Sequence, residues 1–189
     1  ADIVNLSLGG PAASAITNEI QALINSVKVA NINNVLVVSA AGNGGSDGVG
    51  DCNDSNPVYP ANIQEDNMLT VASVDRNNEL TSYSNYGGHT VHVAAPGGDL
   101  YTGDLYSTAL GFCYGPCSQD NAPYVGMSGT SMATPIVAGL AAVVKSAAGN
   151  ITPKQIKEII MNSGNRHNSL IGNVTSESVV NISRATSSF

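Results

Sequence analysis

Apolar residues recur along the chain in two alternating patterns. Short, nearly continuous apolar runs are typical of strands buried on both faces of a sheet, and between them apolar residues fall at helical spacing. The runs that predict strands are Ile3 to Leu8, Val35 to Ala40, Met68 to Val74 and Val91 to Ala94. This alternation predicts an α/β fold in which a mainly parallel sheet has helices on both faces.

Three helices are expected among and after these strands. The first spans about Ser14 to Asn31, and the second begins near Ser131 with apolar residues around most of its circumference, which indicates burial. The third begins at Thr152, where Thr-Pro is a favourable N-cap and first-position pair. From Asn162 to Phe189 the composition becomes polar, so we expect a loosely packed tail with one short element around Val179 to Ala185.

Composition limits the classes of function. The length of 189 residues fits a single domain, residues 1–189. Lys and Arg total 7 against 14 Asp and Glu, and these few cations argue against nucleic acid binding. No run of about eighteen apolar residues is uninterrupted, so no membrane span is expected. The low charge content of 11% and the 20 glycines are typical of a secreted or extracellular enzyme. The segments SLGGP and AAGNGG lack the glycine spacing and lysine of phosphate loops, which disfavours a nucleotide-binding module.

The segment GTSMATP, Gly129 to Pro135, places a serine between small residues where the second helix is expected to begin. Ser131 would lie in the first turn, where backbone N–H groups lack partners and the helix dipole stabilises an oxyanion. Gly129 would let the backbone approach a ligand closely, and a proline near a helix start is tolerated. From these residues alone, Ser131 is either a nucleophile or an N-cap.

GTSMATP and the following IVAGLAA closely resemble the active-serine segment of the subtilisin-like serine peptidases, the subtilases. Further segments match the family pattern in its order along the chain: Asp2 to Gly10, Val35 to Asn43, Tyr59 to Ala61, Met68 to Val74, Ser82 to Ser84 and Ala95 to Gly97. The resemblance implies the C-terminal portion of a subtilisin-like catalytic domain, incomplete at the N-terminal side of the sheet. It also implies a serine endopeptidase that forms an acyl-enzyme on Ser131.

The resemblance gives Asn43 a part in the same chemistry. Its side-chain N–H and the backbone N–H of Ser131 would together stabilise the oxyanion of acyl transfer. From the residues alone, Asn43 also fits a turn position after Gly42 that tolerates a positive φ angle.

The substrate-binding residues implied by the resemblance lie on two segments. Ser7, Leu8 and Gly9 would pair with the substrate backbone as an added strand, although a loop leaving a buried strand explains them equally. The walls of the primary specificity pocket would be Leu8, Gly9 and Gly10 on one side and Ala40, Ala41 and Gly42 on the other. Val58 near the base of this pocket would favour medium apolar side chains.

The subtilase triad runs Asp, His, Ser along the chain, and the first two segments would lie before Asp2. His89, His92 and His167 do not stand in a His-Gly-Thr context, so we expect them to be structural or solvated. The general base and its carboxylate are expected on an N-terminal portion of the same domain, as part of the same chain or as a separate one. Without it the chain is expected to be nearly inactive.

Other partners and an alternative function follow from the same resemblance. The expected partners are a protein or peptide substrate and a propeptide or protein inhibitor. A catalytically inactive subtilase-like binding domain is the alternative, although such a domain has little reason to keep both Ser131 and Asn43.

The loop Gly44 to Asn56 holds three carboxylates, Asp47, Asp51 and Asp54. Subtilases often bind structural calcium, and this density of carboxylates is compatible with it. The spacing matches no ligand pattern, however, so no metal ligand is assigned and a solvated acidic loop is favoured.

The cysteines suggest an oxidising compartment. Cys113 and Cys117, within the stretch Gly98 to Tyr124 that could border the substrate cleft, would close a small disulfide ring; zinc is a weaker alternative because two ligands are lacking. Cys52 would then be free or bonded to the N-terminal portion.

Overall fold

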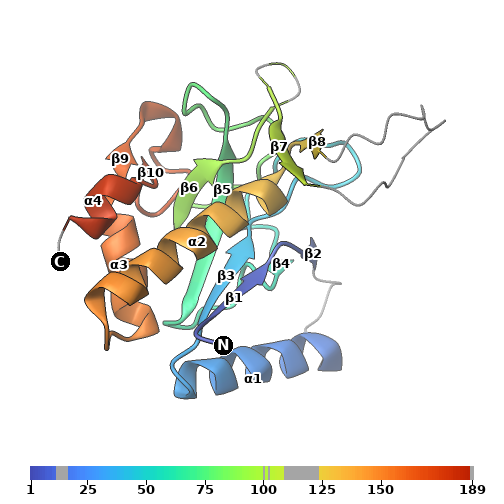
Figure 1. Ribbon diagram of the computed structural model, residues 1–189. Coiled ribbons are helices and arrows are strands. Elements are labelled where there is room, and N and C mark those ends of the chain that lie inside the picture. Colours follow the sequence, from blue (N-terminus) through green and yellow to red (C-terminus); the bar gives the residue numbers. More distant parts are fainter. Residues whose placement is uncertain (12–16, 100, 102, 109–123, 188–189) are drawn as a thin grey trace.

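The computed structural model describes residues 1–11, 17–99, 101, 103–108 and 124–187. Within these residues a six-stranded sheet has the order β1-β3-β5-β6-β10-β9. Its strands are β1 (Ile3–Leu6), β3 (Leu36–Ala40), β5 (Met68–Val74), β6 (Val93–Pro96), β9 (Asn165–Arg166) and β10 (Ser178–Val179). The pairs from β1 to β10 are parallel, and β9 pairs antiparallel with β10. The predicted mainly parallel sheet is therefore confirmed (Figure 1).

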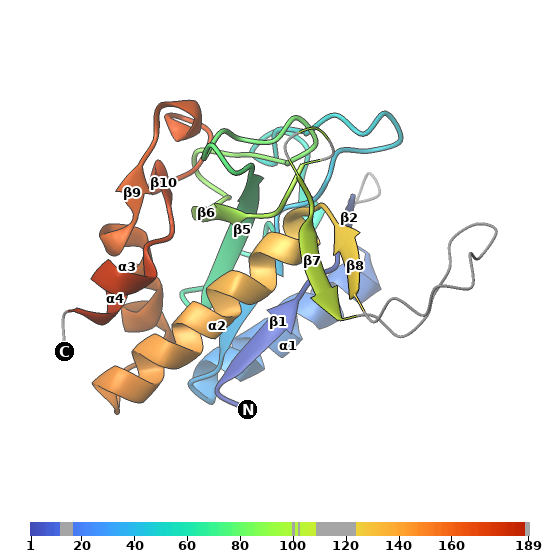
Figure 2. The same cartoon turned by 45° about the horizontal axis from the view of Figure 1, so that its top comes forward.

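Helices cover both faces of this sheet, as predicted. They are α1 (Asn18–Ile32), α2 (Thr130–Ala148), α3 (Pro153–Ser163) and α4 (Ile182–Thr186). Alternate residues of β3 point to opposite faces: Leu36 and Val38 pack in one cluster with Val137 of α2, whereas Val37 packs with Val27 of α1. Figure 2 shows α2 crossing one face of the sheet and α1 on the other.

The helix α2 is the centre of the larger core. By length and composition it is apolar enough to cross a membrane, but it contacts β1, β3, β5 and β6. Its side chains Val137, Leu140, Ala141 and Val144 are buried in the same cluster as the sheet residues. Packing inside the fold therefore accounts for the apolar character of this helix.

The boundaries of several elements differ from the expected ones. The first strand ends at Leu6, so Ser7 and Leu8 lie in the following loop. The first helix begins at Asn18, where the Thr17 hydroxyl accepts a hydrogen bond from the Ile20 N–H and caps it. The strand expected at Val91 to Ala94 is shifted to Val93–Pro96. The cap at Thr152 is confirmed as a capping box with Gln155.

The expectation of a loosely packed tail after Asn162 was wrong. Leu170, Val174, Val179 and Ala185 are all buried. Val179 of β10 pairs with Ala94 of β6, and this region also contains a short 3₁₀ helix, Asn168–Leu170, as well as α4. These few apolar residues are spaced so that each reaches the core, while the polar residues between them cover its outer surface.

Candidate active site

Ser131 is the second residue of α2, at the edge of the sheet where the parallel strands have their carboxyl ends. This edge is where ligands bind in open α/β sheets. The N-cap residue is Gly129 and makes no side-chain capping bond, so the reading of Ser131 as the cap is wrong. Among the residues that the structure describes, none accepts a hydrogen bond from the Ser131 N–H. That group is free for a ligand, as expected in a first helical turn.

Asn43 follows β3 at the same edge, and its side chain is fixed by Thr130. Its Oδ1 accepts hydrogen bonds from the Thr130 N–H at 2.9 Å and from the Thr130 hydroxyl at 2.8 Å. Because these two donors occupy the carbonyl oxygen, the amide must present its Nδ2 hydrogens in the opposite direction. The turn alternative required a positive φ at Asn43, but the positive φ angles here belong to Gly42 and Gly44.

Gly129 keeps the space beside this amide open. Its φ of 153° is one that side-chain-bearing residues rarely adopt, and a Cβ there would lie 3.2 Å from Asn43 Nδ2. The Gly129 N–H donates a 2.9 Å bond to the Gly97 carbonyl, which ties the start of α2 to the end of β6. The glycine therefore lets the nucleophile segment approach the amide donor closely.

A pair of buried asparagines supports the loop that carries Asn43. Asn85 Oδ1 accepts hydrogen bonds from the N–H groups of Gly44 at 2.7 Å and Asp51 at 3.0 Å. Its Nδ2 donates to Asn53 Oδ1, and Asn53 Nδ2 donates to the Ala41 carbonyl. Both asparagines are almost completely buried. The network fixes the backbone on both sides of Asn43, and it was not anticipated because its members are distant in sequence.

Ser7 and Ser131 are joined by two hydrogen bonds. The Ser7 hydroxyl donates to the Ser131 carbonyl at 2.8 Å, and the Ser131 hydroxyl donates to the Ser7 carbonyl at 3.3 Å. The Ser131 carbonyl is available because Pro135, four residues further along α2, has no N–H to donate to it. Proline was expected to be tolerated near the helix start, but Pro135 lies beyond the first turn. Ser7 supplies the hydrogen-bond donor that Pro135 lacks.

The segment after β1 runs beside the buried strand β4 (Val58–Tyr59). Strand β2 (Gly10–Pro11) pairs antiparallel with β4, and a Cβ added at Gly9 would lie 3.3 Å from the Val58 side chain. The Leu8 side chain is 58% exposed. The arrangement brings Val58 next to Gly9, where the sequence predicted a pocket base.

The second expected wall, Ala40 to Gly42, is tied to the nucleophile segment. Ala40 and Ala41 are buried, and the Gly42 N–H donates to the Thr130 hydroxyl at 3.3 Å. Thr130 therefore connects this wall with Asn43. Its role was missed in the sequence, although its position directly before Ser131 in GTSMATP was the available signal.

A cavity of about 360 Å³ opens beside Ser131. The strands β7 (Leu105–Thr108) and β8 (Tyr124–Met127) form one side of it, as the expectation for the stretch Gly98 to Tyr124 suggested. The other side is the first turns of α2, with Met132, Pro135 and Ile136. The nucleophile therefore borders a largely apolar hollow between a hairpin and a helix.

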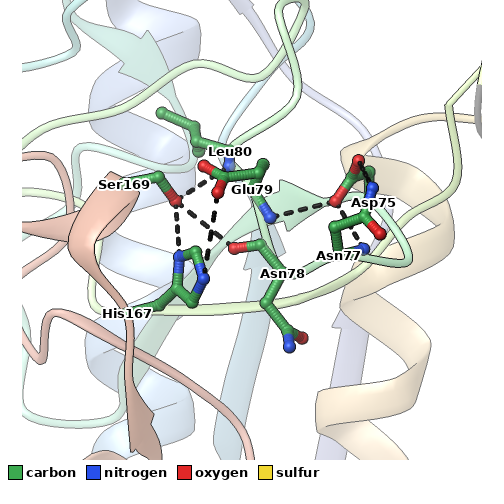
Figure 3. Close-up of polar contacts among 7 residues, drawn as sticks. All are labelled: Asp75, Asn77, Asn78, Glu79, Leu80, His167 and Ser169. Atoms are coloured by element: carbon green, nitrogen blue, oxygen red, sulfur yellow. Dashed lines mark hydrogen bonds and ion pairs between the residues drawn. The ribbon is translucent and has the colours of Figure 1, made fainter.

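The three histidines have partners other than Ser131. His92 Nδ1 accepts from the Thr70 N–H, and the backbone N–H of His89 donates to the Asp54 carboxylate. His167 Nδ1 lies 3.0 Å from the Ser169 hydroxyl, and its Nε2 lies 4.0 Å from Glu79 (Figure 3). These contacts agree with the expected structural roles.

The contacts of Ser169 and His167 resemble those of a catalytic serine and histidine, but they are structural. The Ser169 hydroxyl also accepts a bond from the Leu80 N–H at 3.1 Å and faces the Asn78 carbonyl at 3.3 Å. Figure 3 shows these groups joining the 3₁₀ helix to the loop after β5. A hydroxyl occupied by two backbone groups is poorly placed to attack a substrate.

Two carboxylates of the acidic loop accept hydrogen bonds from the chain itself. The Asp54 carboxylate accepts bonds from the His89 N–H and from the N–H and hydroxyl of Thr90, and Asp47 accepts from the Val49 N–H. In the described part of the chain, no three His, Cys, Asp or Glu side chains gather as a metal site would require. Cys52 is a free thiol there, and Cys113 and Cys117 lie outside the described residues.

Comparisons with known proteins identify the family and the fold. The model of the subtilase family matches residues 1–179. A thermostable alkaline protease of Halalkalibacterium halodurans is 37% identical over 84% of this chain and 35% of the relative. Subtilisin DY of Bacillus licheniformis is 34% identical over 82% of this chain and 47% of the relative. A protease structure from Pseudoalteromonas arctica superimposes with a TM-score of 0.75 at 34% identity, covering 100% of this chain and 51% of that one.

The chain therefore spans between about a third and a half of the length of these relatives. The family match and the two curated relatives cover most of the chain, and the solved structure has the same fold. This chain belongs to the subtilase family.

Proposed function

We propose that the chain forms the nucleophile half of a serine endopeptidase active site. The observation that carries the proposal is the orientation of Asn43: Thr130 holds its Oδ1 and leaves Nδ2 directed away, beside Gly129 and the free N–H of Ser131. Two donors that converge beside a serine hydroxyl are the requirement for stabilising the oxyanion of acyl transfer.

The proposed reaction proceeds through an acyl-enzyme. The Ser131 hydroxyl attacks the carbonyl carbon of the scissile peptide and loses its proton to a general base. Asn43 Nδ2–H and Ser131 N–H hold the resulting oxyanion, after which the C–N bond breaks and the base protonates the leaving amine. Water, activated by the same base, then attacks the acyl carbon, and the bond to the Ser131 oxygen breaks. The carboxylic acid product is released, and the base returns the proton to Ser131. The hydrogen bond from the Ser131 hydroxyl to the Ser7 carbonyl must break so that the hydroxyl can donate to the base instead.

The general base and its carboxylate are proposed to come from another part of the catalytic domain. The rings of His92 and His167 are engaged elsewhere, and the relatives are about two to three times as long. The cavity between the β7–β8 hairpin and α2 is proposed to receive the segment that carries the base, because Ser131 itself lines that cavity. On this proposal the chain alone is nearly inactive.

The substrate is proposed to be a protein or peptide bound along Ser7 to Gly10. The exposed backbone after β1 would add the substrate as a further strand, and Val58 behind Gly9 would restrict the primary pocket to medium apolar side chains. A propeptide or protein inhibitor would bind along the same segment. We also propose that the protein is secreted, which its low charge content supports, and that Cys113 and Cys117 form a disulfide, as an oxidising compartment would allow.

A fluorophosphonate probe tests the proposal on the full-length natural protein. We expect one adduct, located on Ser131 by peptide mass spectrometry, and no adduct in the Ser131→Ala variant. Ser169→Ala is the matched control, since that serine also contacts a histidine, and it should label normally. A folded protein that takes up no probe would instead support the inactive binding domain.

A further inference from the structure

His92 and Lys157 form a partly buried contact at the edge of the sheet opposite the active site. His92 directly precedes β6, and its ring Nε2 lies 2.8 Å from Lys157 Nζ on α3. The ring Nδ1 accepts a 2.9 Å hydrogen bond from the Thr70 N–H of β5. His92 is only 6% exposed. Catalysis by Ser131 does not use either side chain.

The Thr70 N–H determines which nitrogen of the imidazole carries the proton. Because Nδ1 accepts a hydrogen bond, it carries no hydrogen itself. The neutral ring must therefore carry its proton on Nε2. That Nε2–H faces Lys157 Nζ. A protonated amine has three hydrogens and no lone pair, so it cannot accept from Nε2–H. The contact is a hydrogen bond only when Lys157 is a free amine.

From this geometry we propose that Lys157 is a nucleophilic modification site, whose free-amine form takes up activated acyl groups. The imidazole orients the nitrogen lone pair through Nε2–H, and opening of this contact exposes the lone pair to a carbonyl carbon. The amine nitrogen forms a C–N bond, the bond from that carbon to its leaving oxygen breaks, and the nitrogen releases one proton to solvent. The product is an uncharged amide on Lys157.

The surroundings of Lys157 support a free amine. The pKa of Lys157 is lowered to about 8, mainly by burial. The charge of Lys154 contributes to this lowering, whereas Asp66 and Glu158 oppose it. Half of such amines are unprotonated at pH 8, against roughly 0.4% for a lysine of ordinary pKa. Burial, and the charge that Lys157 carries when it is protonated, lower the pKa of His92 to about 3, so the ring stays neutral throughout this range.

Lys154 is the matched control on the same helix. Its Nζ lies 3.2 Å from the Asp66 carboxylate, and its side chain is largely exposed and accessible to a reagent. A difference between the two lysines in the pH at which they react therefore reports the proton on Lys157. The comparison of pH midpoints is independent of how easily the reagent reaches each amine.

The test is trace acetylation with acetic anhydride, from pH 6 to 11, of the full-length natural protein, followed by peptide mass spectrometry. We expect the Lys157 rate to reach half its maximum at about pH 8, well below the pH at which the Lys154 rate does so. His92→Asp places a carboxylate opposite the amine, holds its proton, and should lower the Lys157 to Lys154 rate ratio at pH 8 at least tenfold.

Two results would overturn the proposal. One is a Lys157 midpoint that coincides with that of Lys154 in the native protein. The other is the absence of Lys157 acetylation at every pH at which Lys154 reacts. The native midpoint decides by itself should the His92→Asp variant fail to fold.

Discussion

The Ser7 hydroxyl supplies the hydrogen bond that Pro135 withholds from the Ser131 carbonyl, across 2.8 Å. In an unbroken helix the backbone N–H four residues later would make this bond. Here the loop after β1 makes it instead. The segment proposed to bind substrate and the segment that carries the nucleophile are therefore fixed to one another by a gap in the helix.

Replacing Ser7 by alanine should loosen this junction. The Ser131 carbonyl then loses its donor, which costs about 1 to 3 kcal/mol, and we expect lower stability together with a raised KM for peptide substrates. The measurement is denaturant unfolding and steady-state kinetics of the full-length protein.

A double substitution separates the hydrogen bond from other effects of Ser7. Pro135→Ala restores a backbone N–H to the helix, so the Ser7→Ala and Pro135→Ala pair should recover most of the stability lost in Ser7→Ala alone. Strictly additive losses in the two variants would show that Ser7 does not act through the Ser131 carbonyl.

Asn43→Ala should reduce kcat about a hundred- to a thousandfold with little change in KM, the loss known for the oxyanion asparagine of subtilisin itself. The reason is that the side-chain donor acts on the charge that develops only in the transition state. Steady-state kinetics on a peptide substrate provides the measurement. An equal loss through KM alone would assign Asn43 to substrate binding.

Thr130→Val removes the hydroxyl that holds Asn43 Oδ1 but keeps the backbone donor. The amide then gains freedom to rotate, and we expect kcat to fall by about tenfold, the effect of one hydrogen bond of roughly 1.4 kcal/mol. Thr130→Ser keeps the hydroxyl and should retain most of the activity. If both variants lose the same activity, the hydroxyl is not what orients the amide.

The strands β1, β3, β5 and β6 were predictable because each lies in a nearly continuous apolar run, and Ser131 and Asn43 because they lie in segments that resemble a known family. The buried residues of the tail were not predictable. Leu170 and Val174 stand among polar neighbours, so the sequence shows no periodic pattern that indicates their burial. Thr130 is 87 residues from Asn43 along the chain, so the bond between them follows only from how α2 lies across the sheet.

The buried histidine makes stability depend on pH. The pKa of His92 is about 3 in the folded protein against about 6.5 when unfolded, so below pH 6.5 the unfolded chain binds a proton that the folded one does not. The free energy of unfolding should therefore fall by up to about 1.4 kcal/mol for each pH unit between 6.5 and 3.

Urea unfolding at pH 7 and pH 5 measures this slope. His92→Gln has no proton to gain in this range and should show a smaller decrease than the native protein. A decrease of the same size in both would place the acid sensitivity on other groups.

Asn85→Ala should destabilise the loop that carries Asn43. The partly buried N–H groups of Gly44 and Asp51 lose their acceptor, which costs up to about 1 to 3 kcal/mol for each group that solvent does not reach. Asn25→Ala on the exposed surface of α1 is the control and should change stability little. Thermal unfolding would contradict the assignment if the two variants behave alike.

The central claim is that Ser131 attacks the substrate carbonyl and carries the acyl group. The most direct measurement is rapid acid quenching of the full-length protein during turnover of an activated ester, followed by peptide mass spectrometry. The account predicts an acyl adduct on Ser131 that forms and decays at rates compatible with turnover, and that is absent from Ser131→Ala. Turnover of the ester with the adduct on another residue, or undiminished in Ser131→Ala, would contradict it.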